Sequence, residues 1–216
     1  MSGTTRCCGG GAGARPVAIV YDVDLTLDLP LPESGGTALN ALAHCAEALY
    51  VKGRSPEGDA AAVGGAALIA ASLPRVLAAP QERTAREELL RGAAEAGRAL
   101  GLAGLALAHA MAQALGGRYG ISHGAMNALC LPPALSFNRE LVPDEVARFG
   151  DAIGADAVEG SRALAQLAGF ERLRDFGVPA GDLPQVAAAA AARAGNQANP
   201  RPATPDEIEA LLRSIW

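Results

Sequence analysis

The distribution of apolar residues along the chain predicts helices over most of its length. Apolar positions recur at helical spacing in long runs, and Pro and Gly residues separate these runs. Ser55-Pro56 and Thr204-Pro205 have the form of helix starts, in which an N-cap hydroxyl precedes a proline at the first helical position. The pattern predicts helices at residues 34–51, 56–78, 83–100, 103–115, 124–137, 143–153, 157–170, 182–194 and 205–215.

One short segment departs from this pattern. Residues 16–21, Pro-Val-Ala-Ile-Val-Tyr, are rich in β-branched side chains and predict a strand. A single strand cannot satisfy its own ladder hydrogen bonds, so it must pair with the preceding segment or with a sheet on another chain or domain. Residues 1–15 are Gly-rich and lack periodicity, and we expect them to form a loose arm. The predicted fold class is therefore all-α, with one short N-terminal strand.

Composition narrows the class of protein. Half of the 216 residues are hydrophobic but only 4% are aromatic, so Ala and Gly supply much of the apolar surface and helices can pack closely. The net charge of −5 and the lack of a Lys/Arg cluster argue against a nucleic-acid partner. The apolar run at residues 60–73 is shorter than the ~20 residues of a spanning helix, so no membrane partner is expected. The N-terminus has no apolar signal region, and the four cysteines form no C-x-x-C pair, which favours a reduced, cytoplasmic location.

The three histidines of the chain are its main candidates for chemistry. Asn40 precedes His44 by one helical turn, Gln113 follows His109 by one turn, and His123 opens the next predicted helix. All lie among apolar residues, where buried polar groups need partners. Three imidazoles and an Asn oxygen suit Zn²⁺ or Fe²⁺. The same residues also suit a metal-free polar pocket in which the histidines act as acids, bases or hydrogen-bond donors.

The segments around these histidines resemble the metal-binding motifs of iron-containing alcohol dehydrogenases. Those enzymes join an N-terminal dinucleotide-binding domain to a C-terminal helical domain, and one Asp and three His hold a metal between the two. Their motifs D-A-x-x-H, H-x-x-x-H and P-H-G match residues 40–44, 109–113 and 122–124, and the second and third metal histidines are fourteen residues apart in both. The resemblance covers roughly residues 16–216 and implies a helical bundle of the dehydroquinate synthase-like type.

Asn40, which replaces the family's Asp, and its neighbouring residues are similar to maleylacetate reductases. Those enzymes use a reduced nicotinamide cofactor on maleylacetate. The resemblance implies a metal site made of Asn40, His44, His109 and His123, with His109, Gln113 and His123 as the catalytic residues.

Three departures from the family pattern limit what the resemblance implies. The nucleotide-binding half is expected to be missing, because Gly9–Gly11 has neither a preceding strand nor a following helix. Asn40 is neutral, so we expect Fe²⁺ or Zn²⁺ to be held weakly. Gln113 replaces a histidine that the family uses close to the substrate, and it cannot titrate, which would break a proton relay. The chain alone is therefore expected to bind NAD(P)H poorly.

Three functions remain open from the sequence. The chain favours an oxidoreductase acting on a small-molecule substrate, with NAD(P)H bound by a partner. A second hypothesis is a non-redox cyclase, dehydratase or lyase that uses the same pocket, and a third is a non-catalytic, degenerate subunit. Loss of one domain would leave an apolar face and a strand edge uncovered, so we expect a homodimer or a heteromer.

Overall fold

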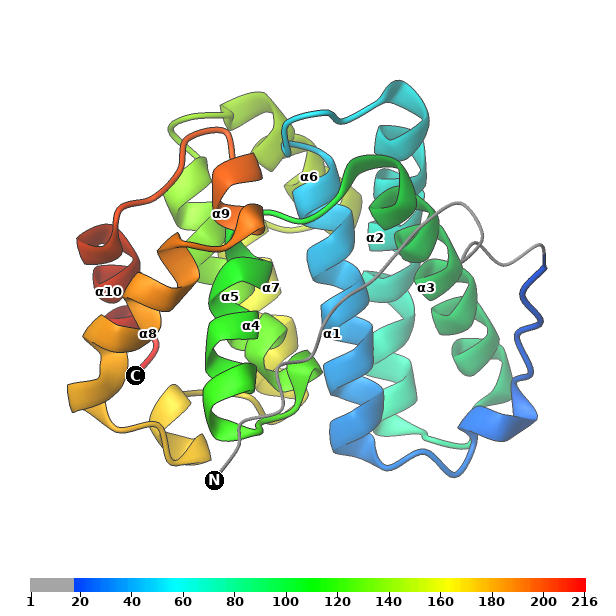
Figure 1. The fold of residues 1–216 in the computed structure, drawn as a ribbon. Helices are drawn as coiled ribbons and strands as arrows, with labels where there is room; N and C mark the ends of the chain where they lie inside the picture. The colour runs from blue at the N-terminus through cyan, green and yellow to red at the C-terminus, as the bar shows by residue number, and fades with distance from the viewer. Residues whose placement is uncertain (1–17) are drawn as a thin grey trace.

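Helix α1 (Leu31–Ala48) runs through the middle of the fold in the computed structural model, which describes residues 18–216 (Figure 1). Helices α2 (Pro56–Ala78) and α3 (Arg83–Ala103) pack on one side of it, and α4 (Leu107–Tyr119) and α5 (His123–Asn138) on the other. The remaining helices are α6 (Pro143–Ile153), α7 (Ala157–Leu167), α8 (Leu183–Ala191), α9 (Ala194–Ala198) and α10 (Pro205–Ser214). Short 3₁₀ helices lie at Asp24–Thr26, Leu173–Phe176 and Ala180–Asp182.

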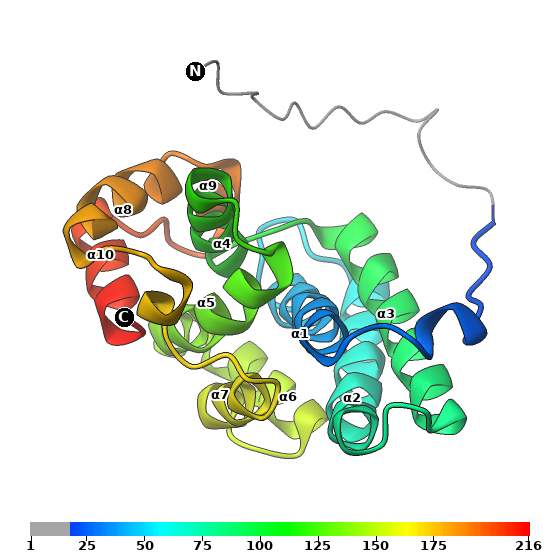
Figure 2. The same ribbon diagram turned by 90° about the horizontal axis from the view of Figure 1, so that it is seen from below.

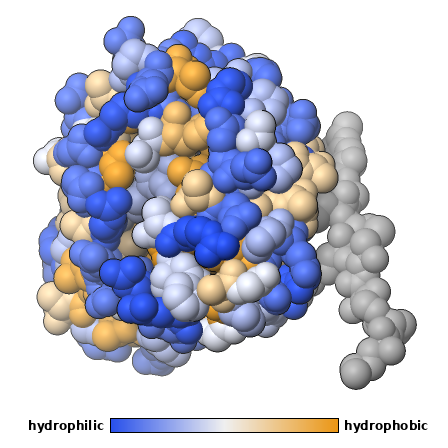
Figure 3. Space-filling view, turned by 90° about the vertical axis from the view of Figure 1, so that its left-hand side faces the viewer, coloured by the Kyte–Doolittle hydropathy of each residue, from blue (hydrophilic) through white to orange (hydrophobic). Residues whose placement is uncertain are grey.

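The view along α1 explains why this helix is apolar on nearly all sides. Figure 2 shows α1 nearly end-on, enclosed by α2 and α3 on one side and by α5 on the other. Most of its residues after Glu33 are buried. By contrast, the outer face formed by α8 and α10 mixes hydrophilic and hydrophobic residues (Figure 3). Polar side chains on α1 therefore lie inside the protein, where they require partners.

The all-α prediction is confirmed. Each predicted helix overlaps an observed one, and those predicted at 56–78 and 143–153 have the same bounds as α2 and α6, whereas the other ends are shifted. The helix ends predicted at residues 100 and 115, just before Gly101 and Gly116-Gly117, were wrong, because these glycines lie inside helices. The chain turns instead at Gly104 and Gly120, where φ is 108° and 67°. Glycine ends a helix where the backbone takes a positive φ, and a count of glycines does not reveal which one does so.

The predicted N-terminal strand is not found in the residues that the structure describes. Residues 18–21 form no strand, and the side chains of Ile19 and Val20 are 61% and 90% exposed. A β-branched sequence favours extended backbone, but a strand forms only where a second strand accepts its hydrogen bonds. No strand lies within residues 18–216 to do so. Residues 16 and 17, and the arm expected at 1–15, fall outside the described residues.

Glycines allow α1 and α5 to approach closely beside the histidines. A Cβ atom placed on Gly124 would lie only 2.4 Å from the backbone of Gly36, so neither helix could be this near with a larger residue at that position. Gly65 allows α2 a similar approach to α3, since its Cβ would lie 3.1 Å from the carbonyl oxygen of Gly92. The backbone of α1 therefore lies directly against the first turn of α5, which begins at His123.

Helix α2 extends beyond the apolar run at residues 60–73, since the helix continues through Pro74. By length and composition α2 could cross a membrane, and the bent pair of α3 and α4 meets the same test jointly. In the structure α2 packs against α1, α3 and α6 as a core helix does.

Candidate functional site

His109 lies at the base of the candidate site and is fully buried on α4. The carboxylate of Glu47, which is also fully buried, lies 2.7 Å from Nδ1 of its ring. A carboxylate can only accept a hydrogen bond, so Nδ1 of His109 carries a proton and donates it to Glu47. Among residues 18–216, Nε2 has no hydrogen-bond partner. Glu47 therefore orients the ring of His109 and leaves Nε2 without a partner in this part of the chain.

Glu47 also closes the N-terminus of α4. Its carboxylate accepts the backbone N–H groups of Ala106, at 2.7 Å, and of His109, at 3.2 Å. Helix α4 has no side-chain cap from its own N-cap residue, and an anion is favourable at a helix N-terminus. One carboxylate thus fixes both the start of α4 and the ring of His109.

His44 and His123 are joined by a chain of amide groups. Asn40 Nδ2 donates to Nε2 of His44 at 3.2 Å. Asn127, which is fully buried on α5, donates from Nδ2 to Oδ1 of Asn40 at 2.7 Å, and this nitrogen lies 3.0 Å from Nε2 of His123. Both rings therefore accept at Nε2. The chain of contacts links α1 to α5 across the close approach at Gly36.

The three imidazole rings lie together. The rings of His44 and His109 stack with centroids 4.2 Å apart, and His109 and His123 have centroids 5.7 Å apart. Burial, followed by the nearby rings of His109 and His123, lowers the pKa of His44 to about 3. Burial and His109 also lower the pKa of His123. His44 and His123 are therefore neutral near pH 7, which is the form that binds metals or accepts protons.

Gln113 lies one turn beyond His109 on α4, at the side of this cluster. Its Oε1 accepts a hydrogen bond from Nη1 of Arg193 at 3.2 Å, and its backbone oxygen accepts one from Nη2 at 3.1 Å. Its hydrogen bonds thus go to an arginine and not to the histidines.

Glu47, Asn127 and Arg193 were missed by the sequence analysis. The sequence contained a recognisable signal for two of these residues. Glu47 is an acidic residue on an otherwise apolar predicted helix, three residues after His44, and Asn127 repeats the one-turn spacing from His123. Arg193 had none, because it comes from a distant segment of the chain.

Comparison with known proteins identifies the family. The model of the Fe-containing alcohol dehydrogenase family, C-terminal, matches residues 35–216. The chain belongs to the iron-containing alcohol dehydrogenase family. It is 37% identical to the maleylacetate reductase of Rhizobium sp. strain MTP-10005, over 95% of this chain and 58% of that enzyme. It is also 34% identical to maleylacetate reductase 1 of Rhodococcus opacus, over 93% of this chain and 56% of that enzyme.

Solved structures agree with this assignment. The crystal structure of the Rhizobium maleylacetate reductase matches with a TM-score of 0.85 at 36% identity, over 91% of this chain and 56% of that one. A 1,3-propanediol oxidoreductase matches with the same TM-score at 33% identity, over 90% of this chain and 55% of that one. The chain therefore has the helical fold of these oxidoreductases and spans a little more than half of their length. The resemblance drawn from the histidine motifs is confirmed at the level of the family.

The family's metal can be tested against the residues of this chain. No three His, Cys, Asp or Glu side chains within residues 18–216 are arranged as ligands of one ion. The donor chemistry does fit: His109 has a free Nε2, and its Nδ1–H is held by a carboxylate, as is typical of metal-binding histidines. The residue types therefore suit a metal of the kind for which the family is named, whereas their arrangement within residues 18–216 does not form a ligand set.

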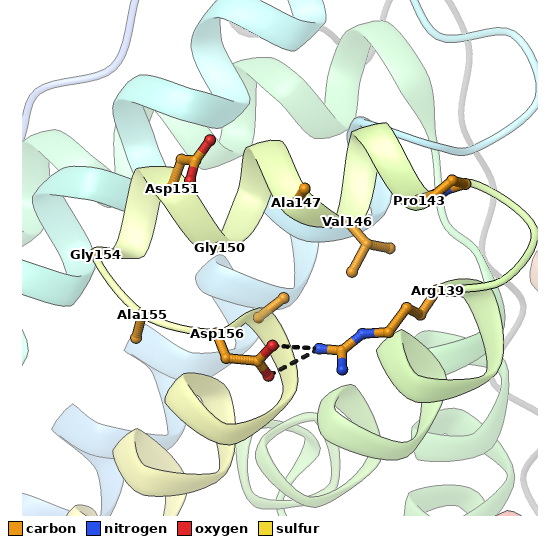
Figure 4. A pocket seen from close by; sticks show the side chains of 10 residues that line it. Arg139, Pro143, Val146, Ala147, Gly150, Asp151, Gly154, Ala155 and Asp156 are labelled. Atoms are coloured by element: carbon orange, nitrogen blue, oxygen red, sulfur yellow. Dashed lines mark hydrogen bonds and ion pairs between the residues drawn. The ribbon is translucent and has the colours of Figure 1, made fainter.

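A separate pocket of about 570 Å³ lies between the end of α5, α6 and the start of α7 (Figure 4). Arg139 and Asp156 form an ion pair across it, with N–O distances of 2.8 and 2.7 Å. None of the predicted site residues lines this pocket. It lies outside the candidate site.

The substitution Glu47→Gln tests how His109 is held. A Gln side chain has one accepting oxygen where Glu has two. One of the three N–H groups that Glu47 accepts, from the backbone of Ala106 and from the backbone and ring of His109, therefore loses its partner. We expect the free energy of unfolding to fall by about 1–3 kcal/mol, measured with urea. We also expect the ring of His109 to change its tautomer, which ¹⁵N NMR of the imidazole detects. The matched control Glu33→Gln lies on the exposed start of α1 and should change neither quantity. An unchanged tautomer in Glu47→Gln would mean that Glu47 does not orient the ring.

Proposed function

We propose that this chain forms the substrate-binding half of an oxidoreductase that reduces the carbonyl group of a small oxo acid. The observation that carries the proposal is the meeting of three imidazoles over a buried carboxylate, with Nε2 of His109 left free. The relationship to maleylacetate reductases supports redox chemistry over a lyase reaction or an inactive subunit. The hydride comes from NAD(P)H held by a nucleotide-binding domain, which residues 18–216 do not form.

Each residue of the site has a separate task in this proposal. His44, His109 and His123, with the amide oxygen of Asn40, are the residues that would hold a divalent metal. When bound, such an ion supplies a Lewis acid that polarises the substrate carbonyl. Glu47 keeps His109 in the tautomer that leaves Nε2 free. Gln113 cannot carry a proton, so the proton for the product oxygen comes from solvent on the side of His123, which is exposed.

Metal binding is expected to be weak because Asn40 contributes no charge. The substitution Asn40→Asp should raise the affinity for Zn²⁺ or Fe²⁺ by about tenfold or more, since a carboxylate is a stronger ligand for a dication than an amide. Equilibrium dialysis with metal analysis measures this. Gln166→Glu adds the same charge at an exposed position on α7 and serves as the control. Equal metal content in Asn40→Asp and wild type would remove Asn40 from the ligand set.

We further propose that the chain works in a homodimer or a heteromer. Ile19, Val20 and Leu25 expose between 61% and 90% of their surface on the segment before α1. Neighbouring exposed apolar side chains on a protein surface are typical of a contact with another chain or domain. A partner that covers this segment could also supply the nucleotide-binding domain.

The function is tested by supplying a nucleotide-binding half. We expect the chain alone to bind neither NADH nor NADPH at micromolar concentration, because a pyrophosphate needs a strand–glycine loop–helix unit and residues 18–216 contain no strand. Fused or mixed with the nucleotide-binding half of the Rhizobium enzyme, it should sediment as a complex. The complex should then oxidise NADH when maleylacetate is added, and His109→Ala should abolish this activity. A complex that forms and binds NADH but leaves maleylacetate unreduced would contradict the proposed function.

A further inference from the structure

Arg193 is a half-buried cation with no anionic partner among residues 18–216. It lies between α8 and α9, and within those residues its guanidinium donates only to Oε1 and the backbone oxygen of Gln113. Its Nε is buried and has no hydrogen-bond partner among residues 18–216. It forms no ion pair with any carboxylate in this part of the chain, unlike Arg118 with Asp182. An uncompensated charge that is partly removed from water raises the free energy of the protein, so a reason for its position is required.

A purely structural role explains another buried arginine better than it explains Arg193. Arg86 also lacks a carboxylate partner, but its Nε, Nη1 and Nη2 donate to Pro80, Ser34 and Leu29 respectively. Arg86 thereby joins α3 to the segment that leads into α1. Arg193 has a free Nε and contacts a single neutral residue, so it retains donors for a further acceptor.

The guanidinium of Arg193 lies along the same face of α4 as His109. His109, Gln113 and Gly117 follow one another at one-turn spacing on that face, about 5–6 Å apart. Arg193 contacts Gln113, and its Nη2 lies 3.8 Å from the position that a Cβ on Gly117 would occupy. Because Gly117 has no side chain, no Cβ packs against the guanidinium at that position. The cation thus bonds to the residue that lies one helical turn beyond His109.

We propose that Arg193 binds a carboxylate of the substrate, with Gln113 orienting its guanidinium. An arginine and a carboxylate form paired, charge-assisted hydrogen bonds, which give both affinity and orientation. The substrate is then an oxo acid whose carboxylate is held by Arg193 while its carbonyl group faces the histidine cluster. Gln113 is suited to this role, because a neutral amide can hold the arginine without neutralising its charge. The carbonyl part of this inference rests on the proposed function, whereas the carboxylate part rests on Arg193 itself.

The test uses succinate, a dicarboxylate without a reducible carbonyl, and the chain without any cofactor. Titration should shift the ring signals of His109 and His123 in NMR spectra, because the ligand lies next to them. Arg193→Gln should weaken succinate binding by about tenfold or more, since a charged hydrogen-bond pair is lost. Arg193→Lys keeps the charge but not the paired geometry, so its succinate affinity should lie between those of wild type and Arg193→Gln. The control Arg91→Gln removes an exposed arginine from α3 and should bind as wild type does. Thermal unfolding followed by circular dichroism confirms that each variant is folded.

Three outcomes would overturn the inference. The first is equal succinate affinity in Arg193→Gln and wild type. The second is displacement of succinate by inorganic phosphate at the same concentration as succinate itself. The third is no binding of succinate by the wild-type chain. Failure here is distinct from failure of the proposed function. A chain that reduces maleylacetate but binds succinate independently of Arg193 loses only the carboxylate site. A chain that binds succinate through Arg193 but reduces nothing loses only the redox assignment.

Discussion

The candidate site depends on one buried carboxylate. Glu47 lies on the central helix α1 and accepts hydrogen bonds from two backbone N–H groups at the start of α4 and from the ring of His109. A buried carboxylate is unfavourable unless its oxygens are hydrogen-bonded, and the first turn of a helix offers unsatisfied N–H groups. The carboxylate of Glu47 and the first N–H groups of α4 therefore supply the hydrogen-bond partners that each needs. The free nitrogen of His109, on which the proposed chemistry depends, follows from this contact.

A second set of contacts fixes the other two histidines. The amides of Asn40 and Asn127 connect Nε2 of His44 to Nε2 of His123, while Gly36 and Gly124 let the backbones of α1 and α5 touch. The site is thus formed where three helices meet at distances that only small residues permit. The maleylacetate reductase of Rhizobium is longer than this chain, which covers 58% of it, and the matching helical part has the same fold.

The sequence predicts some features of the site and not others, for physical reasons. The histidines could be found because one-turn spacing brings Asn40 to His44 and because the three motifs match a family. Glu47 and Arg193 act across α1–α4 and α4–α9, and periodicity within one helix says nothing about such contacts. Helix ends were predicted well where a cap was present, as at Ser55 and Thr204, whose hydroxyls accept backbone N–H groups. They were predicted poorly where a positive φ at a particular glycine decides the end. The strand expected at residues 16–21 has no partner strand among residues 18–216.

The most direct test of this account is whether the three histidine rings lie together in solution. The chain contains only three histidines, so selective labelling yields three sets of ring signals in NMR spectra. A nuclear Overhauser measurement should give strong cross-peaks between the rings of His44 and His109, whose centroids are 4.2 Å apart, and weaker ones between His109 and His123. Absence of the His44–His109 cross-peaks in the folded protein would contradict a single site built over Glu47.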